Sequence, residues 1–543
     1  MFNRRDLIKL GLYGGTAGML HLTRMDSGVL AWALDEFKGN SNLQSQALAA
    51  FTPFTSPLPV PPTIKPVNPN TLPGVPIIPG ATYYDVRMRQ GAVQLFPTGL
   101  ATVVWGYHPT NQKQTNLEPT HLGPTFEARI GETTVVRQHN DLLVNTIIHH
   151  HGGHTPGISD GAALVSQRVP PGTFKDYIYP NDDDICATHW YHDHDLDFTG
   201  HNVFMGLQGY FLLHDDVEDD LNLPGGPGDP AQPGAVPFDL PLVFQDRIFD
   251  FNNQLSYNPF GHDGCIGDHF LVNGAIQPSV QVANRKYRLR FLNGSNARFY
   301  QLSLSNGMPF HMIGSDGGLL ATATDAQSFL IGPSERYEAI IDFSKLKLGS
   351  HVYLNNCMAQ TNGRRPDGLS TQCTNAHPGP DGVGSLLRFD VSFSAHDPST
   401  FTPGQTLRTD IPDFRSRKPD VTREWLFERS NGAWQINGRF YDPNRIDAHV
   451  KLNTTEVWVL RNGGGGWWHP IHIHRNQFQV LKRNDQFPDP LEQGLKDVFV
   501  LEAGDTVEVI TFYNGNAQVG DYVMHCHNVE HEDMRMMMRW TVS

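Results

Sequence analysis

Four pairs of histidines, each with one residue between its two members, constrain this chain more than any other feature. The pairs are His149/His151, His192/His194, His472/His474 and His525/His527. On a strand, residues i and i+2 project from the same face, so each pair directs two imidazoles towards one point. A single pair is more often ordinary surface or core histidine, or part of a zinc site. Eight imidazoles exceed what one tetrahedral zinc ion uses, so the pattern predicts several metal ions on a strand-rich fold.

The last pair encloses a cysteine, Cys526. Because neighbouring side chains of a strand alternate, its thiolate must face away from both imidazoles, towards a second site that stays covalently joined to the first. Further candidate ligands for that site are His469, His531, Met534 and Met536. Two imidazoles, a thiolate and an axial thioether form the ligand set of a blue-copper electron-transfer site. Alternation alone does not choose between the two methionines, and ordinary core packing is the competing interpretation of both.

Composition favours a turn-rich β protein. The 543 residues include 52 Gly and 39 Pro, and 39% are hydrophobic. Period-two runs such as Val507, Val509 and Thr511 are typical of half-buried strands, and no long stretch keeps a helical period. The net charge of -15 makes nucleic acid and anionic membrane surfaces unlikely partners, because the electrostatic force has the wrong sign.

A weak internal repeat indicates three copies of one unit. The segments Val135–Asn140, Arg288–Asn293 and Val457–Asn462 each end a strand-like run in asparagine, and these asparagines lie 153 and 169 residues apart. Such domain-sized intervals predict tandem β-sandwiches. Gly, Pro and Asp in Leu223–Pro237, and the polar segment His396–Lys418, mark the expected boundaries.

The N-terminus has the pattern of an export signal. Arg4 and Arg5 precede a short uncharged stretch from Leu10 to Leu20 and an A-x-A sequence at Ala31 to Ala33. The paired arginines resemble a twin-arginine signal, which implies the twin-arginine export machinery as a partner and a periplasmic or secreted product. A Sec signal or an uncleaved anchor is the alternative, and no later stretch reaches the 18 or so apolar residues that a membrane span needs.

These observations give the following division of the chain: a twin-arginine-type signal peptide at residues 1–33, a Pro-rich N-terminal arm at 34–80, and three domains at 81–230, 236–395 and 415–543. We expect the arm to lie extended on the first domain.

The sequence resembles the multicopper oxidases, specifically the three-domain branch that contains bacterial spore-coat laccase, bilirubin oxidase and phenoxazinone synthase. The matching motifs are His149-His150-His151-Gly152, Trp190-Tyr191-His192-Asp193-His194, His469-Pro470-Ile471-His472-Ile473-His474, and His525-Cys526-His527 followed by His531 and Met536. The resemblance also includes Ser159-Asp160-Gly161, Val272-Asn273-Gly274 and Arg336-Tyr337. It implies three tandem cupredoxin-like Greek-key β-sandwich domains, an all-β fold.

The resemblance also implies four copper ions: one type 1, one type 2 and two type 3. Type 1 copper would be bound by His469, Cys526, His531 and Met536, since the step from His531 to Met536 matches the family. Type 2 copper would be bound by His149 and His472, and the type 3 pair by His151, His192, His194, His474, His525 and His527. Because these ligands come from both ends of the chain, the trinuclear centre is expected between domains one and three, with domain two as a spacer that orients them.

The implied activity is that of a laccase-like or bilirubin-oxidase-like enzyme, and we expect a monomer. Single electrons would come from phenolic, aminophenolic or tetrapyrrole compounds, pass through Cys526 and reduce O2 to water. Asp160 and Glu532 match family positions for proton delivery, and orienting a histidine ligand is an equally good interpretation of each. Trp467 matches a tryptophan of bilirubin oxidases beside the site of electron entry, with packing as the alternative. A cysteine before the V-N-G motif of spore-coat laccase favours a Cys265–Cys357 disulfide.

Three rival functions fit the sequence less well. A metallo-oxidase would use Cu(I) or Mn(II) as reductant in metal homeostasis. Met-rich insertions would favour it, and the sequence has none beyond the copper motif itself. A copper-free scaffold of the same fold would lack the ligands that are all present here. Copper nitrite reductase lacks the four-pair histidine set.

Overall fold

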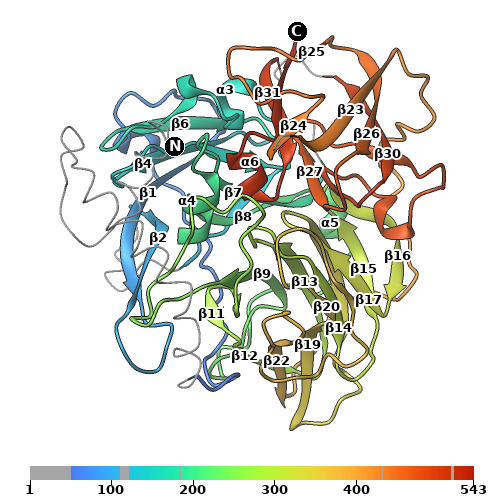
Figure 1. Ribbon diagram of the computed structural model, residues 1–543. Helices are drawn as coiled ribbons and strands as arrows, with labels where there is room; N and C mark the ends of the chain where they lie inside the picture. Colours follow the sequence, from blue (N-terminus) through green and yellow to red (C-terminus); the bar gives the residue numbers. More distant parts are fainter. Residues whose placement is uncertain (1–50, 111–120, 183–184, 431, 515–518) are drawn as a thin grey trace.

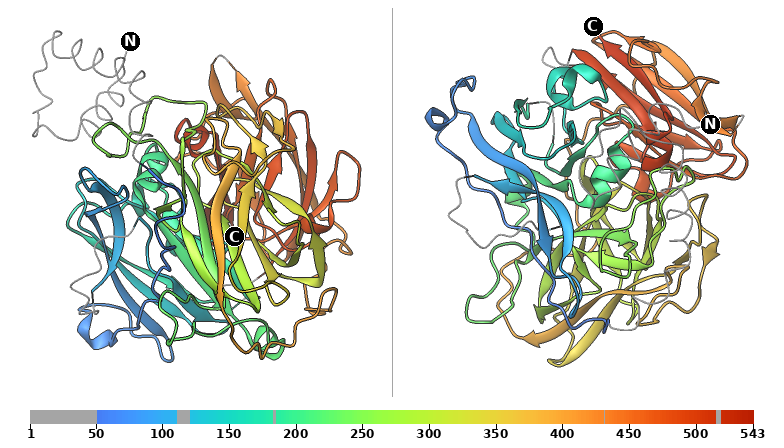
Figure 2. Two further views of the ribbon diagram at one scale, coloured as in Figure 1. Left: turned by 90° about the horizontal axis from the view of Figure 1, so that it is seen from below. Right: turned by 60° about the vertical axis from the view of Figure 1, so that its left-hand side comes forward.

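Three β-sandwiches follow one another along the chain in the computed structural model (Figure 1). The structure describes residues 51–110, 121–182, 185–430, 432–514 and 519–543. The predicted signal peptide and residues 34–50 of the predicted arm therefore lie outside the described residues. Sandwich three, orange to red, lies beside both the blue-to-teal sandwich one and the green-to-yellow sandwich two (Figures 1 and 2).

Sandwich one has two four-stranded sheets, in the orders β2-β1-β4-β6 and β3-β8-β7-β5. Aromatic residues from both sheets, such as Tyr84, Tyr177 and Phe211, fill its core. Its strands are β1 (Thr82–Val93), β2 (Thr102–Pro109), β3 (Phe126–Arg129), β4 (Thr134–Asn140), β5 (Ile148–His151), β6 (Phe174–Tyr179), β7 (Ala187–Asp193) and β8 (Gln208–His214).

Sandwich two pairs a seven-stranded sheet, β11-β10-β9-β13-β18-β15-β16, with a five-stranded sheet, β12-β22-β19-β14-β17. Its strands are β9 (Asp239–Arg247), β10 (His269–Val272), β11 (Ala275–Ile276), β12 (Ser279–Ala283), β13 (Lys286–Asn293), β14 (Tyr300–Leu304), β15 (Phe310–Ser315), β16 (Gly318–Ala326), β17 (Ser328–Ile331), β18 (Arg336–Asp342), β19 (Ser350–Asn356) and β22 (Gly384–Phe393). A separate ribbon joins β20 (Met358–Ala359) and β21 (Gly368–Leu369).

Sandwich three has two five-stranded sheets, β24-β23-β26-β30-β28 and β25-β32-β31-β27-β29. Its strands are β23 (Val421–Ser430), β24 (Ala433–Ile436), β25 (Ala448–Val450), β26 (Thr454–Asn462), β27 (His469–Ile473), β28 (Gln479–Arg483), β29 (Val498–Leu501), β30 (Thr506–Tyr513), β31 (Gly520–Cys526) and β32 (Met537–Val542). The all-β fold of three sandwiches, expected from the sequence, is confirmed.

Each sandwich repeats the same unusual pairing. One parallel pair lies in the first sheet of each, β1 with β4, β9 with β13 and β23 with β26. A second parallel pair lies in the other sheet, β3 with β8, β12 with β22 and β25 with β32. Parallel neighbours need a crossover connection rather than a tight turn, so three identical sets indicate one topology used three times.

The repeated asparagines Asn140, Asn293 and Asn462 end β4, β13 and β26, and all three are buried. In each, the side-chain oxygen accepts a hydrogen bond from the backbone N–H two residues on. In each, the side-chain amide donates to two or more backbone carbonyl oxygens, one of them four or five residues on. The asparagine therefore satisfies the backbone where the chain leaves the strand, which explains why this residue marks the internal repeat.

Helices are short. The described ones are α3 (Gly157–Asp160), α4 (Thr199–Met205), α5 (Asp216–Asp220) and α6 (Val529–Asp533), with single 3₁₀ turns at η3 (Pro69–Thr71), η4 (Val165–Gln167) and η5 (Pro490–Glu492). Among the described residues, none of the helices combines the length and the apolar character that crossing a bilayer requires.

The described part of the Pro-rich arm contacts two sandwiches. Leu58 donates its backbone N–H to Ser279 O of sandwich two at 2.8 Å, and Ile64 donates to Thr125 O of sandwich one at 2.9 Å. The segment Leu223–Pro237 contains no helix or strand. The exact domain boundaries stay a prediction.

The expected Cys265–Cys357 disulfide is wrong. Cys357 is bonded to Cys373 instead, across 16 residues, with a Cα–Cα distance of 5.0 Å. Cys265 is a free cysteine whose backbone N–H donates to Glu530 of sandwich three at 2.9 Å. The loop after β19 returns Cys373 to Cys357, whereas Cys265 is held at the interface between sandwiches.

Candidate metal centres

The histidine pairs lie on neighbouring strands and in register. His149 of β5 is directly opposite His192 of β7, and His472 of β27 is directly opposite His525 of β31. Cross-strand partners have Cβ atoms roughly 4.5–5.5 Å apart, so each pair of strands presents a tight group of imidazoles. In the other three pairs, the second histidine comes directly after the strand: His194 follows β7, His474 follows β27 and His527 follows β31.

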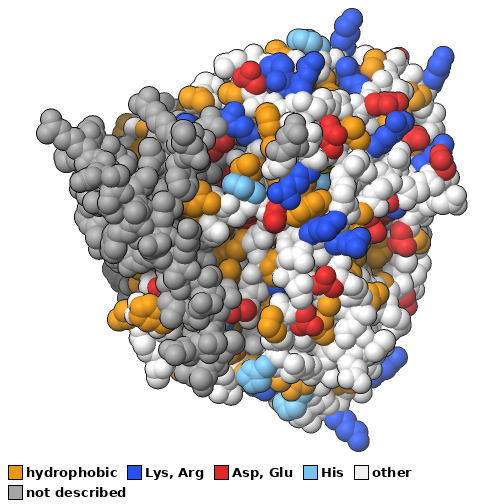
Figure 3. Space-filling view, viewed as in Figure 1, with side chains coloured by type: hydrophobic (Ala, Val, Ile, Leu, Met, Phe, Trp, Pro, Cys, Tyr) orange, Lys and Arg blue, Asp and Glu red, His pale blue; other side chains and the backbone are white. Residues whose placement is uncertain are grey.

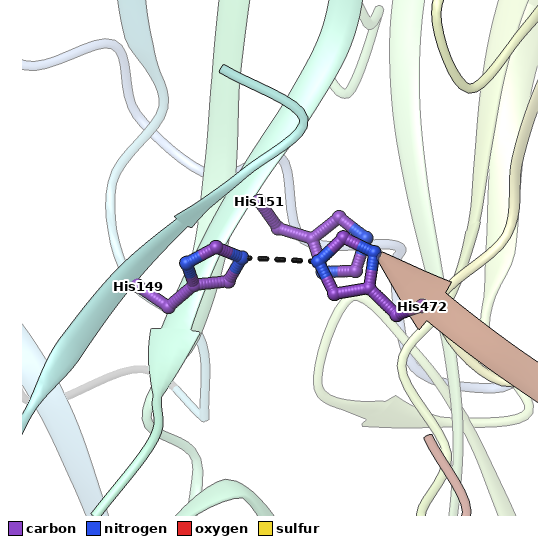
Figure 4. Close-up of side chains that lie close together, drawn as sticks. All are labelled: His149, His151 and His472. Carbon is purple, nitrogen blue, oxygen red and sulfur yellow. Dashed lines mark hydrogen bonds between the residues drawn. The ribbon is translucent and has the colours of Figure 1, made fainter. Parts of the chain in front are cut away.

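The two groups of imidazoles face each other across the interface between sandwiches one and three. His149 Nε2 lies 3.2 Å from His472 Nε2 (Figure 4). His525 Nε2 lies 3.1 Å from His194 Nε2 and 3.2 Å from His474 Nε2. All eight side chains are buried, with at most 2% of any of them exposed. Sequences more than 300 residues apart therefore build one site.

The donor atoms fit shared metal ions. Four groups of three residues each have their candidate ligand atoms within 4.8 Å of one another. Three groups consist of these histidines alone: His149/His151/His472, His151/His192/His527 and His194/His474/His525. The fourth contains a carboxylate: His149/Asp160/His474. Two nitrogens bound to one ion at about 2.0–2.1 Å lie roughly 3–4 Å apart, the spacing seen here. His151 Nδ1 and His192 Nε2 are buried without a hydrogen-bond partner among the described residues. Metal ions would satisfy these atoms.

Acceptors behind the site fix which ring nitrogen faces the centre. His149 Nδ1 donates to the backbone oxygen of Asp160 at 2.6 Å, and His474 Nδ1 donates to the Asp160 carboxylate at 2.7 Å. His525 Nδ1 lies 3.0 Å from Glu532 Oε2, and His194 Nδ1 lies 3.4 Å from Glu532 Oε1. These contacts leave Nε2 of each ring directed inwards and raise its basicity as a ligand.

Burial also sets the charge of the site. It lowers the pKa of His192 to about 3, with the other imidazoles adding to the effect, and lowers the pKa of His469 to about 3. Burial raises the pKa of Asp160 well above its usual range. Burial would raise the pKa of Glu532 too, but His525 and His194 outweigh it and lower the pKa to about 2. The His192 and His469 rings are therefore neutral, with lone pairs available to a cation.

A second, smaller group surrounds Cys526. Its Sγ atom lies 3.4 Å from His469 Nδ1 and 3.5 Å from His531 Nδ1, and the two nitrogens lie 3.2 Å apart. The three residues are buried. They form a fifth group of candidate ligands whose donor atoms lie within 4.8 Å of one another. Met536 is fully buried in the same core, and its carbonyl oxygen accepts from Cys526 N at 3.1 Å. A thiolate with two imidazoles is a donor set that suits copper.

The predicted alternation around Cys526 is present. In β31, Cys526 pairs with Ile471 whereas His525 pairs with His472. Cys526 contributes to the hydrophobic core of sandwich three, while His525 and His527 lie among the eight imidazoles. Burial raises the pKa of the thiol well above its usual range, so an unbound sulfur would stay protonated.

The turn α6 contacts all three sandwiches. Glu530 accepts from Asn296 Nδ2 at 2.8 Å and from Tyr257 Oη at 2.9 Å, both from the region of sandwich two. Asp533 accepts from the backbone N–H groups of Thr199 and Gly200 in α4 of sandwich one at 2.9 and 3.0 Å. The residues between them, His531 and Glu532, face the two candidate centres. Both centres are thus fixed to one short helix.

Aromatic rings and guanidinium groups cover the Cys526 site. Trp434 lies over His531 with ring centroids 3.9 Å apart, and Trp467 meets His531 edge-on at 5.6 Å. The guanidinium of Arg429 lies 4.8 Å from the Trp434 ring and 5.1 Å from the Trp467 ring. Arg364 lies 5.7 Å from the Trp467 ring. On the face drawn in Figure 3, the acidic and basic side chains of the described residues are interspersed.

Sequence reasoning missed several residues of these centres. Trp434 had no distinguishing signal among nine tryptophans. Asn528, whose Nδ2 lies 3.2 Å from His531 Nε2, is recognisable only as the residue before a helix that contains a ligand. Asp497, which contacts His151 at 3.1 Å, directly precedes β29. Charged residues at such a position are usually solvated, so the sequence gives no sign that this one is buried.

Comparison with known proteins agrees with this geometry. Two family models, both described as "Multicopper oxidase", match the chain, one at residues 104–218 and the other at residues 413–543. The chain is 36% identical to bilirubin oxidase of Albifimbria verrucaria over 89% of this chain and 80% of that protein. It is 31% identical to laccase of Bacillus subtilis (strain 168) over 89% and 97% of the two chains. The crystal structure of laccase from Pediococcus acidilactici superimposes with a TM-score of 0.73 at 28% identity, covering 91% of this chain and 96% of that one.

Proposed function

The chain belongs to the multicopper oxidase family, copper oxidoreductases that use O2, and on that premise we propose that it takes single electrons from phenolic, aminophenolic or tetrapyrrole compounds. The observation that carries this function is Cys526, which belongs to one donor cluster while its two covalent neighbours belong to the other. An enzyme that accepts electrons singly and delivers them four at a time needs such a connection.

We assign four copper ions to the donor clusters. His469, Cys526, His531 and Met536 would hold one, and His149 and His472 a second. His151, His192, His194, His474, His525 and His527 would hold the remaining pair. Copper, when bound, supplies the one-electron redox chemistry and the reduction of O2.

The chain itself supplies the route between the clusters. Cys526 is joined by one peptide unit to each of His525 and His527. His525 and Cys526 are the last two residues of β31, and His527 follows directly. The path is short, covalent and closed to solvent, because Cys526 and His525 are fully buried and His527 is 2% exposed.

Two buried carboxyl groups would pass protons to the centre: Asp160, whose pKa is raised by burial, as a protonated donor, and Glu532, whose pKa is lowered to about 2, as a base that takes up a proton and passes it on. Reducing one O2 to two waters consumes four electrons and four protons. The Asp160 carboxylate contacts His474, and Glu532 contacts His525 and His194. We propose that both groups hold these imidazoles in place and deliver protons, since the two roles use the same contacts.

The cover of the Cys526 site favours an organic reductant. Trp434 and Trp467 offer aromatic surface beside His531, and Arg364 and Arg429 place positive charge there. Asp263 offsets part of this charge by pairing with Arg429 at 3.0 Å. Guanidinium groups repel metal cations and attract carboxylate or phenolate groups, so the reductant we propose is an aromatic compound that carries negative charge.

Oxidation of Cu(I) or Mn(II) in metal homeostasis is the alternative. It predicts the opposite dependence on charge, because replacing Arg364 or Arg429 by a neutral residue would then increase the rate.

We further propose export in folded form, directed by Arg4 and Arg5 of the predicted signal at residues 1–33. Replacing both arginines by lysine should keep the protein in the cytoplasm of a bacterial host, as measured by cell fractionation. Export that continues unchanged would point to another route.

The deciding experiment combines copper analysis with O2 uptake. The copper-loaded chain should be blue and contain about four copper ions, and its kcat/KM should be larger for a phenol or bilirubin than for Mn(II) or Cu(I). A large lead for either metal ion would replace the organic substrate by the alternative. A colourless protein with far fewer copper ions would remove the whole assignment.

A further inference from the structure

Five charged side chains form a buried cluster where the three sandwiches meet. They are Asp316, Glu335 and Arg336 of sandwich two, and Lys496 and Asp497 of sandwich three, and no side chain among them is more than 5% exposed. Lys496 Nζ lies 3.0 Å from Asp316 Oδ2 and 3.1 Å from Glu335 Oε1. Burying charges costs free energy even when they are paired, so a cluster of this kind is weak evidence for stability and calls for another explanation.

Arg336 uses every hydrogen of its guanidinium group. It donates two bonds to the Asp497 carboxylate, at 2.6 Å from Nη1 to Oδ1 and 2.5 Å from Nη2 to Oδ2. The other three go to backbone oxygens: Nε to Thr188 in β7, Nη1 to Ser334 and Nη2 to Asp316. A guanidinium has five N–H donors in a rigid plane, so its position and that of the bound carboxylate are fully determined.

Asp497 in turn holds two of the candidate copper ligands. His151 Nε2 donates to Asp497 Oδ1 at 3.1 Å, and His472 Nδ1 donates to the Asp497 backbone oxygen at 2.9 Å. The two imidazoles stack with centroids 3.6 Å apart and an interplanar angle of 15°. With Nε2 engaged, His151 presents Nδ1 to the centre, and that atom is buried without a hydrogen-bond partner among the described residues.

Gly152 lets the cluster approach this closely. A Cβ atom at this position would lie 2.6 Å from His189 Cδ2, 2.9 Å from Arg336 Nη2 and 3.1 Å from Asp497 Oδ2. Its φ of +102° is also a conformation that side-chain-bearing residues rarely adopt. The glycine directly after His151 is therefore required by the contact between the ion cluster and the histidine strand.

We infer that Arg336 and Asp497 are positioning residues of the trinuclear centre: Arg336 of sandwich two holds Asp497, which fixes the tautomer and orientation of His151 and His472. The inference rests on the proposed copper sites. It gives sandwich two a direct contact with the centre, where the sequence indicated a spacer that orients domains one and three.

A purely structural role is the competing explanation, and the chain offers a matched control. Arg298 and Asp246 form another fully buried pair within sandwich two, with Nε to Oδ2 at 2.8 Å, and no contact of either with a histidine is observed among the described residues. Loss of this pair should destabilise the chain without changing the copper centres.

The test compares D497N with D246N in the copper-loaded full chain. The amide of D497N has one oxygen, so it cannot accept the three hydrogen bonds that the two carboxylate oxygens accept from Arg336 and His151, and its NH2 group must face at least one N–H group of these partners. Copper content, competition with a chelator, the electron paramagnetic resonance signal of histidine-bound copper and the blue absorption would be measured, together with thermal unfolding of the copper-free proteins. We expect D497N to lose copper from the histidine cluster with about 10–100-fold weaker retention, and to keep the blue absorption.

The variant R336K provides a second test if D497N does not fold. It keeps the charge but loses the planar two-point contact, and the same selective weakening is expected. If D497N and R336K lose no more copper than D246N does, and their resonance signal is unchanged, the pair is merely structural and the inference fails. A wild-type chain that binds no copper would instead refute the proposed function.

Discussion

Replacing Cys526 by serine tests the connection between the two candidate centres. The Cys526 side chain is fully buried, and its Sγ lies within hydrogen-bonding distance of His469 Nδ1 and His531 Nδ1 at 3.4 and 3.5 Å. A serine hydroxyl is neither soft nor readily deprotonated, so we expect the blue absorption to disappear and one copper ion per chain to be lost. Turnover of every reductant should fall to background.

The fold should survive this change. A hydroxyl in a buried position costs about 1–3 kcal/mol when it lacks a partner, and the two imidazole nitrogens offer partners here. The backbone bond from Cys526 N to Met536 O is unaffected. We therefore expect a loss of about 1–2 kcal/mol in the unfolding free energy of the copper-free chain, equivalent to ~2–8 °C in a unit of 150–250 residues.

The assay needs absorption spectra, copper analysis, O2 uptake and thermal unfolding of both copper-free proteins. Cys186→Ser is the matched control, because Cys186 is also buried and free, and its Sγ lies 3.2 Å from Arg408 Nη1 in a different place. The control should lose comparable stability and keep colour and turnover. Turnover or blue colour that persists in Cys526→Ser would refute the assigned route.

Four further changes have defined outcomes. Burial would raise the pKa of Glu218, but Arg288, His214 and Arg290 outweigh it and lower the pKa well below its usual range. The stability it contributes is therefore present above about pH 4.5 and is lost as the pH falls, and Glu218→Gln should flatten the denaturant-measured stability between about pH 6 and 3. Arg429→Glu should raise KM for an anionic phenol about tenfold, or ~1.4 kcal/mol, and the effect should shrink with added salt. Asn462→Ala should cost at least about 2 kcal/mol of unfolding free energy in denaturant titrations, because it leaves buried backbone groups without partners. Removal of copper by a chelator should lower the unfolding temperature seen by calorimetry, and added copper should restore it.

Each of these has a result that would contradict it. An unchanged pH slope in Glu218→Gln would mean that the ion pairs with Arg288 persist in the unfolded state or add nothing. A KM that ignores the charge at position 429 would place substrate elsewhere. If Asn462→Ala lowers the unfolding free energy by less than about 0.5 kcal/mol, the size expected at a surface position, the hydrogen bonds of this side chain do not stabilise the strand end as argued. Equal unfolding temperatures with and without copper would argue against tight binding.

Chemistry that depends on local spacing could be predicted from the sequence. Two histidines at i and i+2 share a face on any strand, so the convergence of each pair and the opposite direction of Cys526 needed no tertiary information. The repeated asparagines Asn140, Asn293 and Asn462 were visible too, although their task in closing the strand ends appears only from the hydrogen bonds.

Contacts between distant segments could not be predicted. Arg336 and Asp497 are 161 residues apart, and a charged residue next to a strand has the same sequence context whether it is solvated or buried. The expected Cys265–Cys357 disulfide is wrong for a different reason, because it was inferred from the resemblance to spore-coat laccase. Cysteine positions do not reveal that a 16-residue loop returns Cys373 to Cys357 while a backbone bond to Glu530 holds Cys265.

The five residues of α6 impose a mechanical limit on how this molecule can move. Glu530 is bonded to the region of sandwich two and Asp533 to sandwich one, while the two residues between them face both candidate centres. A hinge rotation of any sandwich would therefore shift His531 and Glu532 together and disturb both candidate centres. We therefore expect a reductant to reach the Cys526 site through movements of surface side chains and loops rather than through a rotation of one sandwich against another.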